Sequence, residues 1–120
     1  MGLGNDSHPF TLIGTLECGE LDTPNKRYQL GKNISIDGLT CLNMTAQNIT
    51  ISCNGFTIQG DNSSTTYGVY TNQFNSTVAN CTILNFSSGI FISVVEATES
   101  RFYNNTINIT YVDGYGVYAE

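Results

Sequence analysis

The fold of this chain is decided by Cys53-Asn54-Gly55-Phe56-Thr57-Ile58, because two later stretches repeat its pattern. These stretches are Ala79-Asn80-Cys81-Thr82-Ile83 and Tyr103-Asn104-Asn105-Thr106-Ile107. The isoleucines that end the three stretches lie 25 and 24 residues apart. A unit of about 24 residues cannot bury its own apolar face, so its copies must stack on one another as the turns of a solenoid do.

A second motif follows each of these stretches. It reads Gly68-Val69-Tyr70 in the first unit, Gly89-Ile90-Phe91 in the second and Gly116-Val117-Tyr118 in the third. Its spacing of 21 and 27 residues indicates loops of unequal length between the two motifs. Residues 33–36 and 48–52 alternate with period two, and no amphipathic helical pattern lasts beyond about one turn. The chain is therefore predicted to be all-β.

A coil of three short strands per turn fits this unit. Successive turns would then stack as parallel strands about 4.8 Å apart. We expect the repeated apolar residues to form two internal columns. The first column is Ile58, Ile83 and Ile107, and the second is Val69, Ile90 and Val117.

The corners of the coil are predicted from asparagine and glycine. Asparagine tolerates left-handed backbone and can hydrogen-bond to the neighbouring turn, so one corner should stack Asn54 or Gly55 with the equivalent asparagines of the later units. Those equivalents are Asn80 and Asn104. The repeated glycines are interpreted as a second bend. They are Gly68, Gly89 and Gly116.

Composition and charge argue against two classes of partner. The net charge is −6 with a pI of about 4.4, and the basic residues other than His8 are only Lys26, Arg27, Lys32 and Arg101. Nucleic-acid phosphates require clustered cations, so we expect no nucleic acid. No run of about 18 apolar residues predicts a membrane span. Met1 to Pro9 lacks the charged and apolar regions of a signal peptide.

The four cysteines are best explained as two disulfides. With no C-x-x-C pair and a single histidine, a metal site is not expected. Of the three pairings we favour Cys18 with Cys41 and Cys53 with Cys81, because each pair is about one repeat apart and would lie on adjacent turns. Each closed loop would stabilise the fold by roughly 3 kcal/mol. Four buried thiols in a reducing cell are the alternative; disulfides favour an extracellular location.

Asn-x-Ser/Thr triplets are much denser than chance. The chain has 14 Asn and 25 Ser plus Thr in 120 residues. Random placement would give about 3 glycosylation-type triplets, yet ten occur. They begin at Asn5, Asn33, Asn43, Asn48, Asn62, Asn75, Asn80, Asn85, Asn104 and Asn108.

Two explanations compete for this excess. One is N-glycosylation of a secreted surface, for which Asn62 and Asn75, in loop-like surroundings, are the best acceptors. The other is that a repeat with asparagine at each strand entrance and a solvent-facing threonine two residues later produces the triplet without any sugar. Asn80, which precedes Cys81, is expected to point inward and to stay unmodified.

Residues 46–58 also resemble a known family. Together with the segments that precede them, they are similar to the start of right-handed parallel β-helix proteins of the pectin-lyase-like, NosD-like type, found among archaeal and bacterial surface proteins. The preceding segments are Cys18-Gly19, Pro24-Asn25, Tyr28-Gln29-Leu30, Asn33-Ile34 and Cys41. The resemblance covers about residues 17–119 and implies a right-handed parallel β-helix (solenoid) of about four short turns. The resemblance is a poor guide to activity, because this fold hosts lyases, hydrolases, isomerases, adhesins and inert scaffolds.

The residues do not predict an enzyme. Polysaccharide lyases of this fold use a cationic base with calcium-binding acids, and its hydrolases use converging carboxylates. The acidic residues here do not repeat in phase, and Arg101 is better explained as an exposed charge facing Glu99 or Asp113. A negative surface would also repel acidic polysaccharides. We therefore expect no catalytic residue, no metal and no cofactor.

The aromatic residues leave carbohydrate binding as the alternative function, since rings stack on sugar faces. Tyr70, Phe91 and Tyr118 recur in phase, which favours a structural stack inside or beside the coil over a binding pocket. A carbohydrate-binding or carbohydrate-active domain of the lyase or hydrolase kind is thus the second interpretation of the chain.

The predicted primary function is structural. We expect residues 1–16 to form an N-terminal extension whose segment Phe10-Thr11-Leu12-Ile13 adds as a strand to a neighbouring subunit, and residues 17–120 to form one β-helix domain. Glu120 follows a strand motif directly, so we expect an open edge that either further chain or another copy covers. The predicted protein is an extracellular, glycosylated scaffold that stacks head to tail into a filament or surface-layer element.

Overall fold

The computed structural model describes residues 11–13, 16–93, 99–111 and 114–120, and these residues form an all-β parallel solenoid of about four turns. They contain fourteen strands and no helix. The strands belong to three sheets, and every strand pairing is parallel. The predicted fold class is confirmed.

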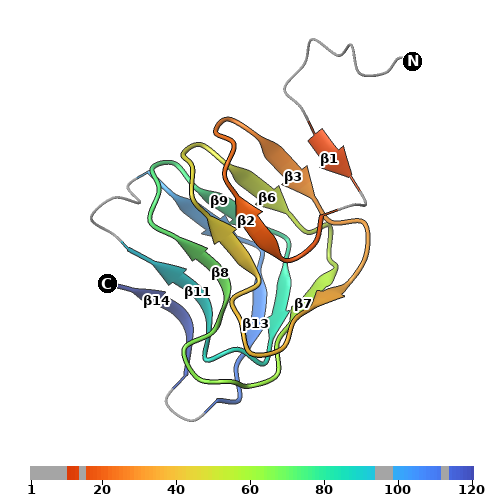
Figure 1. The fold of residues 1–120 in the computed structure, drawn as a ribbon, viewed down its shortest axis with the longest axis vertical. Helices are drawn as coiled ribbons and strands as arrows, with labels where there is room; N and C mark the ends of the chain where they lie inside the picture. Colours follow the sequence, from red (N-terminus) through yellow and green to blue (C-terminus); the bar gives the residue numbers. More distant parts are fainter. Residues whose placement is uncertain (1–10, 14–15, 94–98, 112–113) are drawn as a thin grey trace.

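From β2 onward the chain visits the three sheets in rotation, so each strand pairs with the strand one turn later (Figure 1). Sheet 1 contains β1 (Thr11–Ile13), β3 (Arg27–Gln29), β6 (Thr50–Ser52), β9 (Thr77–Ala79) and β12 (Arg101–Tyr103). Sheet 2 contains β2 (Gly19–Leu21), β5 (Leu42–Met44), β8 (Tyr67–Thr71), β11 (Ser88–Ile92) and β14 (Tyr115–Ala119). Sheet 3 contains β4 (Ile34–Ser35), β7 (Thr57–Gln59), β10 (Thr82–Leu84) and β13 (Thr106–Asn108).

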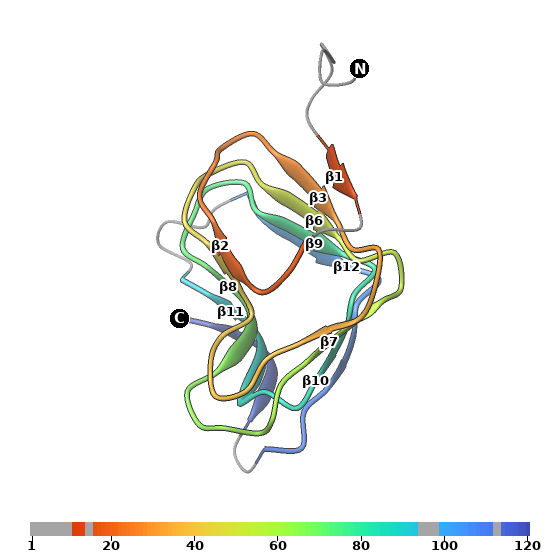
Figure 2. The same cartoon turned by 45° about the vertical axis from the view of Figure 1, so that its right-hand side comes forward.

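The sheets enclose one apolar interior, around which the turns are nested in Figure 2. In sheet 3, Ile58 is in register with Ile83 and Ile83 with Ile107, as the repeat predicts. The second predicted column is also confirmed in sheet 2, where Val69, Ile90 and Val117 align. A third column, in sheet 1, joins Tyr28, Ile51, Val78 and Phe102. Each turn thus contributes one side chain to each column, and the three columns together form a continuous core.

The predicted asparagine corner is present between sheets 1 and 3. Asn54, Asn80 and Asn104 all adopt left-handed backbone, with φ of 54°, 59° and 55°. The Asn54 amide donates to the Leu30 carbonyl one turn earlier at 3.0 Å. Asparagine is selected here because its short polar side chain tolerates this conformation and hydrogen-bonds locally.

The repeated glycines do not mark a bend, so that prediction was wrong. Gly68, Gly89 and Gly116 lie inside β8, β11 and β14. A Cβ at Gly68 would lie 2.5 Å from Cγ2 of Ile83, and a Cβ at Gly89 would lie 2.4 Å from Cγ2 of Ile107. Glycine is needed at the first two positions because the isoleucine column of sheet 3 occupies the space of a side chain.

The two ends of the core differ. Leu16 is buried at the end near β2 and belongs to the core cluster. At the other end Val117 is 48% exposed, although Val69 and Ile90 in the same column are fully buried. β1 pairs with β3 of its own chain, so part of the predicted extension extends sheet 1. The described part of the chain has no helix with the length and apolarity to cross a membrane.

Candidate functional site

The two disulfides join adjacent turns in the predicted pairing. Cys18 bonds to Cys41 and Cys53 bonds to Cys81, with Cα atoms 4.4 and 4.7 Å apart. The described chain has no free cysteine. Because each bridge links one turn to the next, the pair restrains the solenoid along its axis.

A second asparagine corner, between sheets 2 and 1, carries a ladder of amide hydrogen bonds. Asn25, Asn48 and Asn75 all have left-handed backbone. The Asn48 amide donates to Asn25 Oδ1 and the Asn75 amide to Asn48 Oδ1, each at 2.7 Å. Glu99, also left-handed with φ of 63°, holds the equivalent position of the next turn, two residues before Arg101 as Asn75 is two before Thr77.

The predicted glycosylation residues divide by backbone conformation. Left-handed φ values occur at Asn48, Asn62, Asn75, Asn80, Asn85 and Asn104. This conformation explains why asparagine recurs at the corners, and it supports the structural explanation for part of the excess. Of the other four predicted acceptors, Asn5 lies outside the described residues, whereas Asn33, Asn43 and Asn108 follow different backbone geometry.

Exposure changes the ranking of the acceptors. Exposed side chains belong to Asn33, Asn48, Asn62, Asn80, Asn104 and Asn108. Asn80 does not point inward, so that expectation was wrong. Asn75, favoured from the sequence, is partly buried and holds the ladder described above. Asn43 lies in β5, and its Oδ1 is buried without a hydrogen-bond partner among the described residues.

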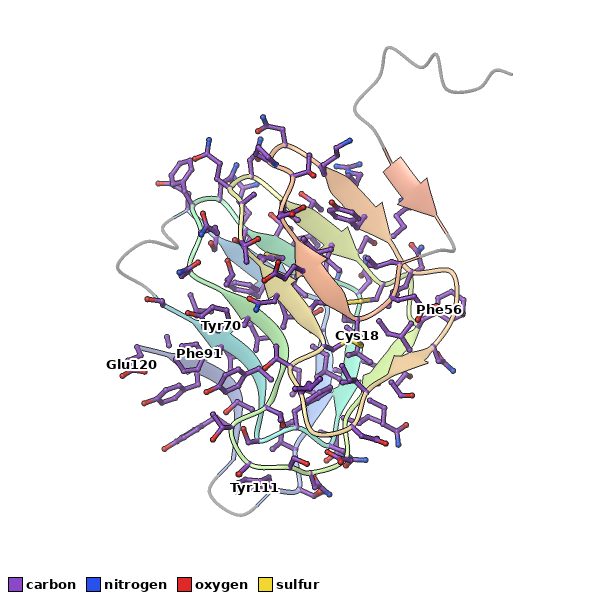
Figure 3. All side chains as sticks on the ribbon, viewed as in Figure 1. Cys18, Phe56, Tyr70, Phe91, Tyr111 and Glu120 are labelled. Carbon is purple, nitrogen blue, oxygen red and sulfur yellow. A yellow bond between two sulfur atoms is a disulfide. The ribbon has the colours of Figure 1, made fainter. Side chains whose placement is uncertain are left out.

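The aromatic repeat forms a cluster on the outer surface of sheet 2. We call Tyr67, Tyr70, Phe91, Tyr115 and Tyr118 the aromatic face. The Phe91 ring centroid lies 5.4 Å from that of Tyr70 and 5.2 Å from that of Tyr118. Figure 3 shows Tyr70 and Phe91 together on the outside of the ribbon, with Glu120 near the edge and Tyr111 on the loop below. The predicted stack is thus a flanking one and not part of the core.

Two members of the aromatic face were not identified from the sequence. Tyr67 and Tyr115 each precede the glycine of the second motif, where β11 has Ser88 instead. Tyr67 lies 4.8 Å from Phe91, and Tyr115 lies 4.9 Å from Tyr118, between ring centroids. The signal in the sequence that could have identified them is the residue before the repeated glycine, which is Tyr, Ser and Tyr in the three successive units.

The acidic residues that the structure describes are dispersed. Among the described residues no group of three or more His, Cys, Asp or Glu side chains could hold a metal ion. Asp61 is committed to a turn, because its Oδ1 accepts hydrogen bonds from Ser63 Oγ at 2.6 Å and from the Gly38 N–H at 3.0 Å. These bonds hold the pKa of the Asp61 carboxyl below its ordinary value. Lys32 forms an ion pair with Glu17 at the exposed surface.

Comparison of the chain with protein-family models, with curated proteins and with solved structures finds no match.

Proposed function

We propose that this protein is an extracellular structural element, a glycosylated parallel β-solenoid that stacks head to tail into a filament or surface layer. The observation that carries this proposal is that the two ends of the solenoid are complementary: the first strand that the structure describes belongs to sheet 1 and the last belongs to sheet 2. β1 extends sheet 1 one strand beyond β3, and β14 extends sheet 2 one strand beyond β11. After a strand in sheet 2 the chain always continues into sheet 1.

A second copy placed on the open end would continue this order. β1 of the added copy would follow β12 in sheet 1, and β2 would follow β14 in sheet 2. An unpaired parallel edge is a template for such addition, and a contact between two different ends propagates without closing. Burial of the half-exposed Val117 side chain would add an apolar contribution.

Three features support an extracellular setting. Two disulfides are typical of oxidising compartments. Among the sequon asparagines that the structure describes, six are exposed and accessible to a glycosyltransferase. The resemblance of residues 46–58 to pectin-lyase-like, NosD-like surface proteins agrees with this setting. We further propose a non-catalytic role, since the described carboxylates do not converge.

The assembly is tested with Val117→Lys and a matched control, Leu39→Lys. Leu39 is 63% exposed in the loop before β5, away from the open end of sheet 2. The wild type and the Leu39 variant should form particles that grow with concentration in light scattering and fibres in electron microscopy, whereas the Val117 variant should stay monomeric. A wild type that is monomeric at all concentrations, or fibres that persist in the Val117 variant, would refute head-to-tail stacking.

Deleting residues 1–14 tests the role of β1. The deletion should abolish assembly while the remaining turns keep their β circular dichroism. Fibres of unchanged length after the deletion would exclude β1 from the contact.

Glycosylation is tested on protein from its natural source. Intact mass before and after enzymatic removal of N-glycans should differ, and peptide mapping should locate sugars at exposed acceptors such as Asn62 and Asn104 in preference to Asn43. An unchanged mass would refute the glycosylated scaffold.

A further inference from the structure

The aromatic face contains a notch at one position. In sheet 2, Tyr67 of β8, Ser88 of β11 and Tyr115 of β14 are in register. Strands in a sheet lie about 4.8 Å apart, so the backbones that carry the two tyrosines are about 9.6 Å apart with a small side chain between them. The resulting cavity has a volume of about 250 Å³. Its described lining residues are Ser64, Thr65, Tyr67, Ser87, Ser88, Phe91, Tyr111, Tyr115 and Tyr118.

The floor of the notch offers an unused polar group. Ser88 is only 5% exposed, yet its hydroxyl makes no hydrogen bond to another described residue. Ser88 lines the notch, so its hydroxyl can donate a hydrogen bond to a ligand there and accept one from it. The Tyr67 and Tyr115 hydroxyls likewise have no hydrogen-bond partner in the described part of the chain.

The rim of the notch is held in place before any ligand arrives. The Thr66 N–H donates to Ser87 Oγ at 3.0 Å, and Ser87 Oγ donates to the Thr66 carbonyl at 2.7 Å. Thr66 Oγ1 also donates to the Ser63 carbonyl at 2.8 Å. Thr65, beside them, has φ of 56°, a conformation that β-branched residues rarely adopt. A rim fixed by such contacts loses little entropy on binding.

The charges around the notch select against an anionic ligand. Its described lining includes no lysine or arginine, and the Glu120 carboxylate lies close enough to affect Tyr67. Burial raises the pKa of Tyr67, and Glu120 raises it further, so the phenol stays protonated and can donate a hydrogen bond. The chain as a whole carries a net charge of −6. A polyuronate would therefore be repelled.

We propose that this notch binds one ring of a neutral saccharide, held between Tyr67 and Tyr115 and hydrogen-bonded to Ser88. A pyranose combines an apolar C–H face, which stacks on aromatic rings, with hydroxyls that both donate and accept hydrogen bonds. The volume is below the range of about 300–1,000 Å³ typical of sites for drug-sized ligands, so a single ring fits and the rest of the glycan lies along the aromatic face.

The experiment uses the full chain and neutral hexasaccharides of glucose, mannose, galactose, xylose and N-acetylglucosamine, followed by amide chemical shifts. At least one should bind, with shifts concentrated at Tyr67, Ser88 and Tyr115. Tyr115→Ala removes one stacking ring and should weaken binding about tenfold. Ser88→Tyr completes the aromatic column, fills the notch and should abolish binding.

Tyr103→Ala is the matched control. Tyr103 is 52% exposed on β12 of sheet 1, comparable to the 54% of Tyr115, and lies outside the notch. Its substitution should leave saccharide affinity unchanged. Hexagalacturonate serves as the acidic-sugar probe and decaproline as the peptide probe. The proposal is overturned if none of the five neutral hexasaccharides binds, if binding survives both notch variants, or if only one of these two probes binds. Because Tyr115 is half exposed, its variant should keep the wild-type spectrum and melting temperature.

Discussion

The interior glycines give the sharpest test of how the turns pack. A Cβ added at Gly89 would lie 2.4 Å from Cγ2 of Ile107 and 2.6 Å from the carbonyl oxygen of Gly116. Carbon atoms pack best at about 3.5–4.0 Å, so both contacts are far too short. Neither neighbour can withdraw easily, because Ile107 belongs to an internal column and the carbonyl belongs to the adjacent backbone. We predict that Gly89→Ala destabilises the solenoid.

The magnitude follows from overpacking. Forcing one methyl group into a filled core costs about 1–3 kcal/mol. For a chain of this size each kcal/mol lowers the melting temperature by about 4 °C, so Gly89→Ala should lower it by about 4–12 °C. Adding Ile107→Ala removes one of the two clashes, so the two losses should be less than additive.

Gly116→Ala is the internal control, since it has the same register position in the next turn. Its Cβ would lie 3.7 Å from Cγ2 of Ile107, an ordinary contact. A Gly→Ala change at an unstrained position stabilises the folded protein by about 0.4–1 kcal/mol, because it reduces the conformational entropy of the unfolded chain. The melting temperature of the Gly116→Ala variant should therefore rise slightly. Thermal circular dichroism at a concentration where the protein is monomeric measures both variants. Equal losses at Gly89 and Gly116 would refute the packing argument and favour a common bend.

Three further predictions concern the bridges, a turn and the amide ladder. Replacing Cys53 and Cys81 together by alanine should cost about 3 kcal/mol by the loop-closure estimate, measured by urea unfolding; an unchanged midpoint would contradict it. The stability that Asp61 contributes should be fully present above the ordinary carboxyl pKa of 3.8 and should be lost as the pH falls through the lowered pKa of the folded state. The difference in melting temperature between the wild type and Asp61→Asn should therefore disappear in acid. A difference that persists in acid would contradict the hydrogen-bonded turn. Asn48→Ala removes both rungs of the ladder and should cost about 1–2 kcal/mol in urea, whereas Asn108→Ala, on an exposed strand position, should be near neutral. Equal effects of the two asparagine variants would refute the ladder.

The repeat in the sequence determined which residues stack. Parallel turns place equivalent residues one above another, so Ile58, Ile83 and Ile107 could be aligned by counting alone. The disulfide pairing followed from the same periodicity, since cysteines about one repeat apart meet on adjacent turns. The corner formed by Asn54, Asn80 and Asn104 was also predictable, because left-handed backbone restricts the residues that can occupy it.

Only the tertiary structure decided which way the outer side chains lean and what space remains between them. Tyr67 and Tyr70 are three residues apart, so strict strand alternation would send them to opposite faces, yet both rings contact Phe91. The alternation is broken because the two residues between them, Gly68 and Val69, are both buried. The glycines likewise could not be assigned to packing until the isoleucines of sheet 3 were placed against them. Periodicity specifies neighbours along the axis of the solenoid, whereas contacts between its sides depend on the angle at which the sheets meet.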